Sequence, residues 1–202
     1  MRNKQEGMVI IISAPSGAGK TTICDAVVKK NKNIVYSIST TTRTPRKGEK
    51  NGKEYFFVTE QQFKNAIKQK QFVEWAKVHN NYYGTSKKIL ESIISKGKDV
   101  LLDIDVQGAI KIKKQYKNAL MIFIMTPSLK VLKQRLIKRN KDSKQIIDIR
   151  LKNAEKEISY IDKYDYLVIN DKLPESIKQV ENIISCSRLS TKRNNFIFWR
   201  KK

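Results

Sequence analysis

Residues 13–22, SAPSGAGKTT, carry the residue types of a phosphate-binding loop. In the usual pattern a glycine is followed by four free residues and then by Gly-Lys-Ser/Thr. Here Gly19, Lys20 and Thr21 fit the pattern, whereas Ala14 stands at the position of the first glycine. Alanine is acceptable there if its φ is negative, which is what we expect for Ala14. The alternative is an ordinary glycine turn between a strand and a helix.

The chemistry of such a loop is anion binding. Its backbone N–H groups and the N-terminus of the following helix favour phosphate through hydrogen bonds and the helix dipole. Lys20 would then reach the β- and γ-phosphates of a nucleotide, and the Thr21 hydroxyl would help to hold Mg²⁺. The sequence therefore predicts a triphosphate site formed by Ala14, Pro15, Ser16, Gly17, Ala18, Gly19, Lys20, Thr21 and Thr22.

Two acidic residues in VLLDIDVQG (100–108) form the second candidate group. Asp103 and Asp105 lie at the end of an apolar run that predicts a strand, and residues two apart on a strand face the same side. An aspartate at such a place orients Mg²⁺ or its water ligands beside a phosphate-binding loop. We therefore expect Asp103 to help hold Mg²⁺. The alternative is a strand end with two solvated carboxylates.

A cluster of hydrogen-bond donors lies in SISTTTRTPRKGEKNGKEYFFV (37–58). Arg43 and Arg46 are three residues apart, and Tyr55 comes further on. The planar donor fork of arginine matches phosphate oxygens in a way that lysine does not. The stretch predicts a second phosphate site, distinct from the loop, with a solvated basic turn as the alternative.

Polar residues in FVEWAKVHNNYYGTS (72–86) are candidates for recognising a base, namely Glu74, Tyr83 and Thr85. A buried carboxylate can accept hydrogen bonds from N1–H and from the exocyclic amine of guanine. Adenine presents a lone pair at N1 and would be rejected. The sequence shows no cluster of histidine and cysteine that would indicate a zinc-type site.

The elements that must position these residues alternate between strands and helices. Buried strands of a parallel sheet are indicated by apolar runs at 8–13, 119–127 and 164–170, and residues 98–114 predict a strand with an acidic end followed by a helix. Helical spacing and N-cap residues predict further helices at 21–31, 59–72, 128–140 and 174–189, and one after a polar loop within 141–158. This order favours an α/β fold with a parallel sheet core and right-handed crossovers. Residues 34–85 depart from it and predict an inserted lobe of strands and one helix.

The composition is that of a globular protein with a large excess of positive charge. The 202 residues are 40% hydrophobic, and 42 Lys and Arg against 19 Asp and Glu give a net charge of +23. Such a charge could attract nucleic acid, but no basic platform interleaved with aromatic residues accompanies it. We favour a compositional bias towards lysine and expect no specific nucleic-acid partner.

Two further features bear on location. The apolar run at 8–12 is far too short to span a bilayer. The two cysteines, Cys24 and Cys186, cannot build a disulfide scaffold and are typical of a reducing compartment. We therefore expect a cytoplasmic protein that does not associate with membranes.

Five stretches together resemble the guanylate kinase family: SAPSGAGKTT, TTRTPRKGEKNGKEYFFV, EWAKVHNNYYGTS, LLDIDVQGA and YDYLVIND. The likeness runs in order through residues 8–185, and an alanine at position 14 also occurs in bacterial members. The resemblance implies a P-loop NTPase-like core (1–34, 86–126 and 159–202), a GMP-binding lobe (35–85) and a helical lid (about 127–158). It also implies Mg²⁺-dependent transfer of the ATP γ-phosphoryl group to GMP or dGMP, within purine nucleotide metabolism.

The resemblance assigns residues to both nucleotides. For GMP it implies contacts at Ser39, Arg43, Arg46, Glu49, Tyr55, Glu74, Tyr83, Thr85 and Asp105. For ATP it implies the loop residues 14–22 and Asn170, with Mg²⁺ held by Thr21 and, partly through water, by Asp103. The implied catalytic cations are Lys20, Arg43, Arg135, Arg139 and Arg150. One departure lies in the lid, where Lys138-Arg139-Asn140 replaces the Gly-Arg-Gly of many members.

Two other function classes stay open. One is a guanylate-kinase-like binding domain without catalysis, although such domains have usually lost Lys20, Thr21, Asp103 and the lid arginines. The other is a nucleic-acid-binding protein, which the net charge motivates. The oligomeric state is also open, because both a monomer and a homodimer are compatible with the sequence.

Overall fold

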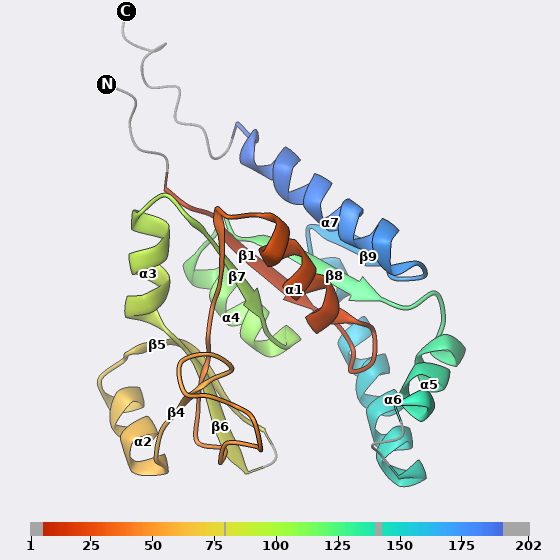
Figure 1. Ribbon diagram of the computed structural model, residues 1–202, viewed down its shortest axis with the longest axis horizontal. Helices are drawn as coiled ribbons and strands as arrows, with labels where there is room; N and C mark the ends of the chain where they lie inside the picture. The colour runs from red at the N-terminus through yellow and green to blue at the C-terminus, as the bar shows by residue number, and fades with distance from the viewer. Residues whose placement is uncertain (1–5, 79, 140–142, 192–202) are drawn as a thin grey trace, which may run out of the picture.

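The computed structural model describes residues 6–78, 80–139 and 143–191. Residues 1–5, 79, 140–142 and 192–202 lie outside the described residues, and these include Asn140 of the predicted lid and most of the basic C-terminal tail. Figure 1 shows a central sheet with helices on both faces, a second, smaller sheet on one side, and the helices α5 and α6 on the other.

Five parallel strands form the central sheet, in the order β2-β7-β1-β8-β9. In that order their bounds are Ile34–Tyr36, Asp99–Asp103, Val9–Ser13, Leu120–Met125 and Tyr166–Ile169. The inner strands are the apolar runs of the sequence, and every residue of β1 is buried. This is the pattern of a strand that helices cover on both faces. The predicted α/β fold with a parallel sheet core is confirmed.

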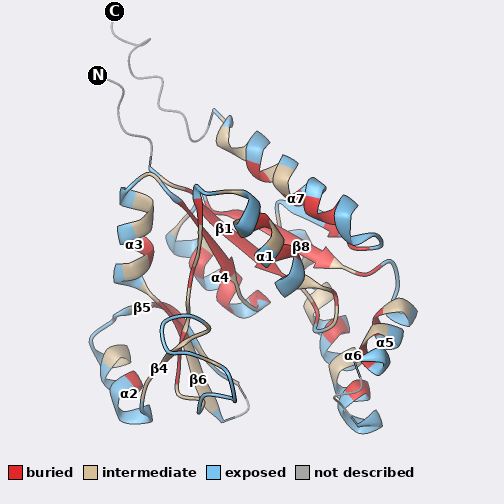
Figure 2. Ribbon diagram, viewed as in Figure 1, coloured by how far each residue is buried: buried red, intermediate tan, exposed pale blue. Residues whose placement is uncertain are grey.

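Successive residues of β1 face opposite layers of helices. The flanking helices are α1 (Lys20–Lys30), α3 (Lys87–Ser95), α4 (Val106–Gln115) and α7 (Leu173–Arg188). Ile10 and Ile12 pack with apolar side chains of α1 and α7, whereas Val9 and Ile11 pack with those of α3 and α4. Figure 2 shows the buried residues concentrated on the inner strands and on the helix faces turned towards them. The core thus lies in two layers, one on each side of the sheet.

A second sheet of four strands lies between residues 40 and 86, in the order β4-β3-β6-β5. Its strands are Phe56–Phe57, Thr40–Thr41, Asn81–Ser86 and Phe72–Val78, and the helix α2 spans Glu60–Lys68. The predicted N-cap, Thr59, opens α2 with a capping box that it shares with Gln62. The helix predicted to reach residue 72 ends at Lys68, because Lys70 has a positive φ of 53° and Phe72 already pairs in β5.

The chain passes from the central sheet to the small sheet between β2 and β3. β2 pairs with β7, and β3 pairs with β4 and β6. The lobe boundary predicted at residue 35 therefore falls inside β2 of the central sheet, and β6 carries the small sheet to Ser86.

Two helices follow β8, namely α5 (Leu129–Lys138) and α6 (Lys144–Ile158), and a short 3₁₀ helix (Ile161–Lys163) leads on to β9. Ser128 caps α5 as predicted, since its hydroxyl accepts a hydrogen bond from the N–H of Val131 at 3.2 Å. Leu132 and Leu136 of α5 pack against α6 in a small separate core. None of the helices that the structure describes is long and apolar enough to cross a bilayer.

A buried carboxylate fastens the end of α7 to the sheet. Asp99 opens β7, and its Oδ1 accepts a hydrogen bond from the backbone N–H of Met8 at 2.7 Å. Its Oδ2 accepts from Arg188 Nε, and Arg188 Nη2 also lies 2.7 Å away. The Asp99 side chain is only 5% exposed, so water cannot replace these charge-assisted bonds.

We expect Asp99→Ala to lower the free energy of unfolding by about 3 kcal/mol, because a buried N–H and a guanidinium lose their acceptor. Urea denaturation followed by circular dichroism measures this change. The control is Glu175→Ala, which removes an ion pair with Lys172 whose side chains are 66% and 71% exposed. We expect that variant to stay within about 0.5 kcal/mol of the unmodified protein. Equal effects of the two substitutions would contradict the prediction.

Candidate active site

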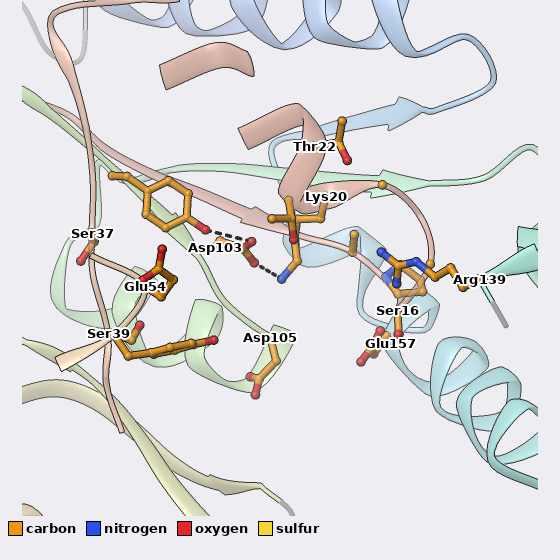
Figure 3. A pocket seen from close by; sticks show the side chains of 17 residues that line it. Ser16, Lys20, Thr22, Ser37, Ser39, Glu54, Asp103, Asp105, Arg139 and Glu157 are labelled. Atoms are coloured by element: carbon orange, nitrogen blue, oxygen red, sulfur yellow. Dashed lines mark hydrogen bonds and ion pairs between the residues drawn. The ribbon is translucent and has the colours of Figure 1, made fainter. Parts of the chain in front are cut away.

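The segments that follow β1, β2 and β7 meet around one cavity of about 450 Å³ (Figure 3). All carboxyl ends of a parallel sheet lie at one edge, and ligands of α/β proteins bind there. The segments after these strands contribute loop residues 14–17 and 19–22, Tyr36, Ser37, Ser39, Asp103 and Asp105. The segment before β4 and the paired helices α5 and α6 contribute Glu54, Tyr55, Arg139 and Glu157. The cavity therefore joins all three predicted parts of the chain.

Two glycines shape the phosphate-binding loop. Gly17 and Gly19 have φ values of 96° and 94°, which a side chain would disfavour. A Cβ on Gly17 would lie 2.9 Å from Leu136 Cδ2, so α5 packs directly on the loop. Ala14 has the predicted negative φ, since the described non-glycine residues with positive φ are Lys70 and Asn80.

The loop is supported by an asparagine from the far end of the chain. Asn170, which follows β9, is buried, and its Nδ2 donates a hydrogen bond to the Ala18 carbonyl at 2.7 Å. A Cβ on Gly19 would lie 2.4 Å from that nitrogen, so this close approach requires glycine. The predicted ATP residues 14–22 and Asn170 are therefore in one place.

Lys20, the first residue of α1, forms an ion pair with Asp103 at the end of β7. The Tyr36 hydroxyl donates a hydrogen bond to the other oxygen of Asp103, at 3.1 Å. Burial and the neighbouring Asp103 raise the pKa of Tyr36 well above its usual range. Tyr36 therefore keeps its proton and acts as a donor that fixes the Asp103 carboxylate.

Asp105 reaches the cavity for a different reason from the one predicted. β7 ends at Asp103, and Asp105 is the N-cap of α4, where its Oδ1 accepts a hydrogen bond from the N–H of Gly108 at 2.8 Å. The two carboxylates thus line one cavity as a strand end and a helix cap, and not as neighbours on one face of a strand.

A second cavity of about 200 Å³ shares four residues with the first: Ser39, Tyr55, Asp103 and Asp105. It is also lined by Glu74 and Tyr83, which the sequence predicts, and by Ala76 and Ile104, which it does not. The β5–β6 register places Glu74 beside Thr85, whose hydroxyl donates to Glu74 Oε1 at 2.8 Å. Glu74 is 8% exposed, and this burial raises its pKa despite the bond from Thr85.

Gly108 in α4 leaves room for the Glu74 carboxylate. A Cβ on Gly108 would lie 3.1 Å from Glu74 Oε2 and 3.5 Å from Asp105 Oδ1. Gly108 lies in the first turn of α4, and glycine there costs up to about 0.5–1 kcal/mol relative to alanine. Gly108 is therefore best explained by the space that the two acidic side chains occupy.

Arg43 and its neighbours form a compact cluster at the edge of the second cavity. Arg43 Nη2 donates to both oxygens of Glu49, at 2.8 and 2.9 Å, and the backbone N–H of Arg46 donates to Glu49 at 2.7 Å. These bonds lower the pKa of Glu49, with Arg43 as the largest cause. The Arg43 guanidinium lies 5.3 Å from the centre of the Tyr55 ring, which packs edge-on against Tyr83. Arg43 and Arg46 are not among the residues that line the two described cavities.

The three arginines predicted for the lid take different positions. Arg150 on α6 donates a hydrogen bond to the Ser16 hydroxyl in the phosphate-binding loop. Arg139, at the end of α5, lines the first cavity. Arg135 instead donates to the backbone carbonyl of Asn170 at 2.8 Å, which ties α5 to the segment after β9. In the structure, Arg135 therefore supports the site from outside the cavity.

Four residues of the first cavity escaped the sequence prediction: Tyr36, Ser37, Glu54 and Glu157. Tyr36 and Ser37 could have been found, because Tyr36 ends and Ser37 follows a strand of the same parallel sheet as Asp103. Glu157 lies seven residues after Arg150, which puts both on one face of a helix, and this spacing was a usable signal. Glu54 accepts a hydrogen bond from the N–H of Lys50 within a turn, and the sequence holds no comparable signal for it.

Glu157 is the unusual member of this group. Its Oε2 atom is buried and has no hydrogen-bond partner among the described residues. Burial raises the pKa of Glu157 to about 6, while the charge of Lys20 opposes this shift and that of Asp105 adds to it. Glu157 thus combines a raised pKa with a place on the wall of the first cavity.

A parallel sheet, a phosphate-binding loop and a lysine at the start of α1 define a nucleotide-binding protein of the phosphate-loop class. Comparisons with known proteins agree, since the guanylate kinase family model matches residues 6–187. The chain belongs to the guanylate kinase family, whose members are kinases, and it is an enzyme of this kind.

Individual relatives cover almost the whole chain. The guanylate kinase of Clostridium tetani is 44% identical over 189 residues, which is 94% of this chain and 90% of the relative. That of Thermotoga maritima is 42% identical, over 94% of this chain and 91% of the relative. The crystal structure of guanylate kinase from Anaplasma phagocytophilum is 35% identical with a TM-score of 0.77, over 94% of this chain and 90% of that one.

We expect Glu157→Gln to stabilise the protein above pH 6 but not near pH 4. Because the folded-state pKa of about 6 is raised, the contribution of Glu157 to stability is largest below its unfolded-state pKa and is lost as the pH rises through about 6. Allowing for partial exposure, the gain at pH 7.5 is about 1 kcal/mol.

Urea denaturation from pH 4 to pH 7.5 measures this difference. The matched control is Glu155→Gln, which removes an exposed carboxylate from the same helix. Its unfolding free energy should follow that of the unmodified protein at every pH. A Glu157→Gln effect that does not change with pH would contradict the assignment of the raised pKa.

Proposed function

We propose that this protein transfers the γ-phosphoryl group of ATP to GMP in a Mg²⁺-dependent reaction that yields ADP and GDP. The observation that carries the proposal is a continuous site, in which a phosphate-binding loop and a pocket around a buried carboxylate share four lining residues. Membership of the guanylate kinase family supports the same reaction.

In this proposal each cavity takes one nucleotide. ATP places its phosphates on residues 14–22 and its base towards Asn170, whereas the guanine of GMP lies against Glu74. The Glu74 carboxylate accepts hydrogen bonds from guanine N1–H and from its exocyclic amine, and it faces a lone pair if adenine enters. Ser39, Thr85 and Asp105 complete the surroundings of the base. The phosphate of GMP lies towards Arg43, Arg46, Tyr55 and Tyr83, with Glu49 orienting Arg43.

The residues present fit a magnesium ion. Thr21 offers a hydroxyl at the start of α1 and Asp103 offers a carboxylate, and both line the first cavity. Such hard oxygen ligands, completed by water and by substrate phosphates, suit Mg²⁺. When bound, Mg²⁺ would neutralise part of the negative charge of the transferring phosphoryl group.

The reaction makes electrostatic demands and needs no general base. The attacking atom is a phosphate oxygen of GMP, which is already ionised at pH 7. The difficulty is to bring two anions together and to stabilise the charge on the transferring group, which preorganised cations do best. Lys20 and the lid arginines Arg139 and Arg150 are the cations for this task, with Arg135 holding the lid to the donor side. Closure of the lid would exclude water and so limit ATP hydrolysis.

The proposal extends in three ways that rest on the family alone. We propose dGMP as a second acceptor, a role in purine nucleotide recycling, and a cytoplasmic location. A monomer and a homodimer are both compatible with it.

A panel of acceptors tests the reaction. With ATP as the donor, we expect GMP to be phosphorylated and AMP, CMP and UMP to be poor acceptors, as measured by coupled ADP release. Lys20→Ala should lower turnover about a thousandfold without loss of fold, because the phosphates lose their nearest cation. Equal use of GMP and AMP would refute the role of Glu74. The absence of ADP release with every acceptor would favour a binding domain without catalysis.

Gly108→Ala should separate stability from the use of GMP. The new Cβ forces Glu74 Oε2 to move by a few tenths of an ångström, while alanine favours the helix by about 0.5–1 kcal/mol. We therefore expect an unchanged or higher unfolding temperature, a KM for GMP raised about tenfold, and an unchanged KM for ATP. Glu74→Gln serves as the reference for a direct loss of base recognition. An unaltered KM for GMP in Gly108→Ala would contradict this account of the glycine.

A further inference from the structure

The first cavity contains a carboxylate to which the proposed mechanism gives no task. Glu157 lines it from the last turn of α6, and its Oε2 is a buried acceptor without a donor among the described residues. Native proteins satisfy nearly all such atoms, so each exception needs a reason. A group that burial makes costly to ionise is retained most readily where it serves a function.

Lys20 is the cation that faces this carboxylate. The two cationic residues that line the described cavity are Lys20 and Arg139, and the Arg139 side chain is exposed to solvent. The charge of Lys20 is the one that acts to lower the pKa of Glu157. Figure 3 shows the Lys20 side chain reaching into the cavity towards Asp103, and Glu157 lines the same cavity from α6.

Lys20 has two competing partners. It is paired with Asp103 in the structure, yet phosphate binding requires its ammonium group to turn towards the loop. Asp103 cannot follow this movement, because the Tyr36 hydroxyl holds its second oxygen and its backbone belongs to β7. The side chains of Lys20 and Asp103 are only 20% and 13% exposed, so breaking their pair is unfavourable unless another anion takes over.

We propose that Glu157 is a positioning residue that receives the Lys20 ammonium group as it leaves Asp103 and holds it for the phosphates of ATP. An ammonium group has three donors and can bond to a carboxylate and to phosphate oxygens together. α6 is already attached to the loop, because Arg150 donates to Ser16. The same helix thus brings an arginine to the loop and a carboxylate to its lysine.

ATP titration of four proteins tests this inference without any acceptor. They are the unmodified chain, Glu157→Gln, Lys20→Met and the double variant. We expect Glu157→Gln to weaken ATP binding about tenfold when Lys20 is present and not to weaken it in the Lys20→Met background. A carboxylate that only repels phosphate would give tighter binding in both backgrounds, and one that only supports the fold would give weaker binding in both. Either result would overturn the inference.

Kinetics with GMP give a second readout, which rests on the proposed function. Glu157→Gln should lower kcat about tenfold and leave the KM for GMP unchanged, whereas Glu155→Gln should match the unmodified protein. Glu157→Asp keeps the charge and should recover part of the loss. An unchanged kcat in Glu157→Gln would count against the inference. If the unmodified chain phosphorylates no acceptor, the proposed function fails, and the ATP titration still decides the role of Glu157.

Discussion

The parallel register of the central sheet is the constraint on which the whole site depends. β1 and β7 pair so that Ile12 lies beside Asp103, and the phosphate-binding loop therefore begins next to a carboxylate. β2 lies on the other side of β7, which brings Tyr36 to the same edge. Tyr36 ends β2 and Asp103 ends β7, so both side chains reach the carboxyl edge of the sheet, where the loop after β1 brings Lys20. A slip of one residue in any of these pairings would turn the side chains to the opposite face.

The sequence predicts most reliably the features that neighbouring residues determine. The loop, the inner strands and the caps at Thr59 and Ser128 depend on neighbouring residues, and the structure has them where they are expected. The end of α2 was predicted wrongly, because Phe72 continues the helical spacing but pairs with Ser86 across the small sheet. Asp105 was also placed for the wrong reason: the sequence predicts it on a strand, whereas it is the N-cap of α4 at the same edge of the sheet. The spacing of Glu157 from Arg150 indicates a shared helix face, but the place of Glu157 in the cavity depends on how α6 packs against the loop.

The site also collects features that oppose folding. Gly108 weakens a helix, Gly17 and Gly19 hold a backbone that other residues avoid, and the carboxylates of Glu74 and Glu157 are buried. All of them lie in or beside the two cavities, and none of them stabilises the fold. The two apolar layers around β1 and the Asp99–Arg188 pair lie elsewhere in the fold and offset these costs. Such a separation between destabilising residues at the cavities and stabilising residues in the core is expected for a functional site on a rigid fold.

The hydrogen bond from Asn170 to Ala18 links residues 152 positions apart. During synthesis on the ribosome, the loop is therefore made well before the amide that supports it. Until residue 170 has been added, a nascent chain lacks this hydrogen bond to Ala18. Arg135 bonds to the carbonyl of the same asparagine, so this attachment of α5 also forms only after residue 170 has been made. One asparagine thus couples the support of the loop to the attachment of α5.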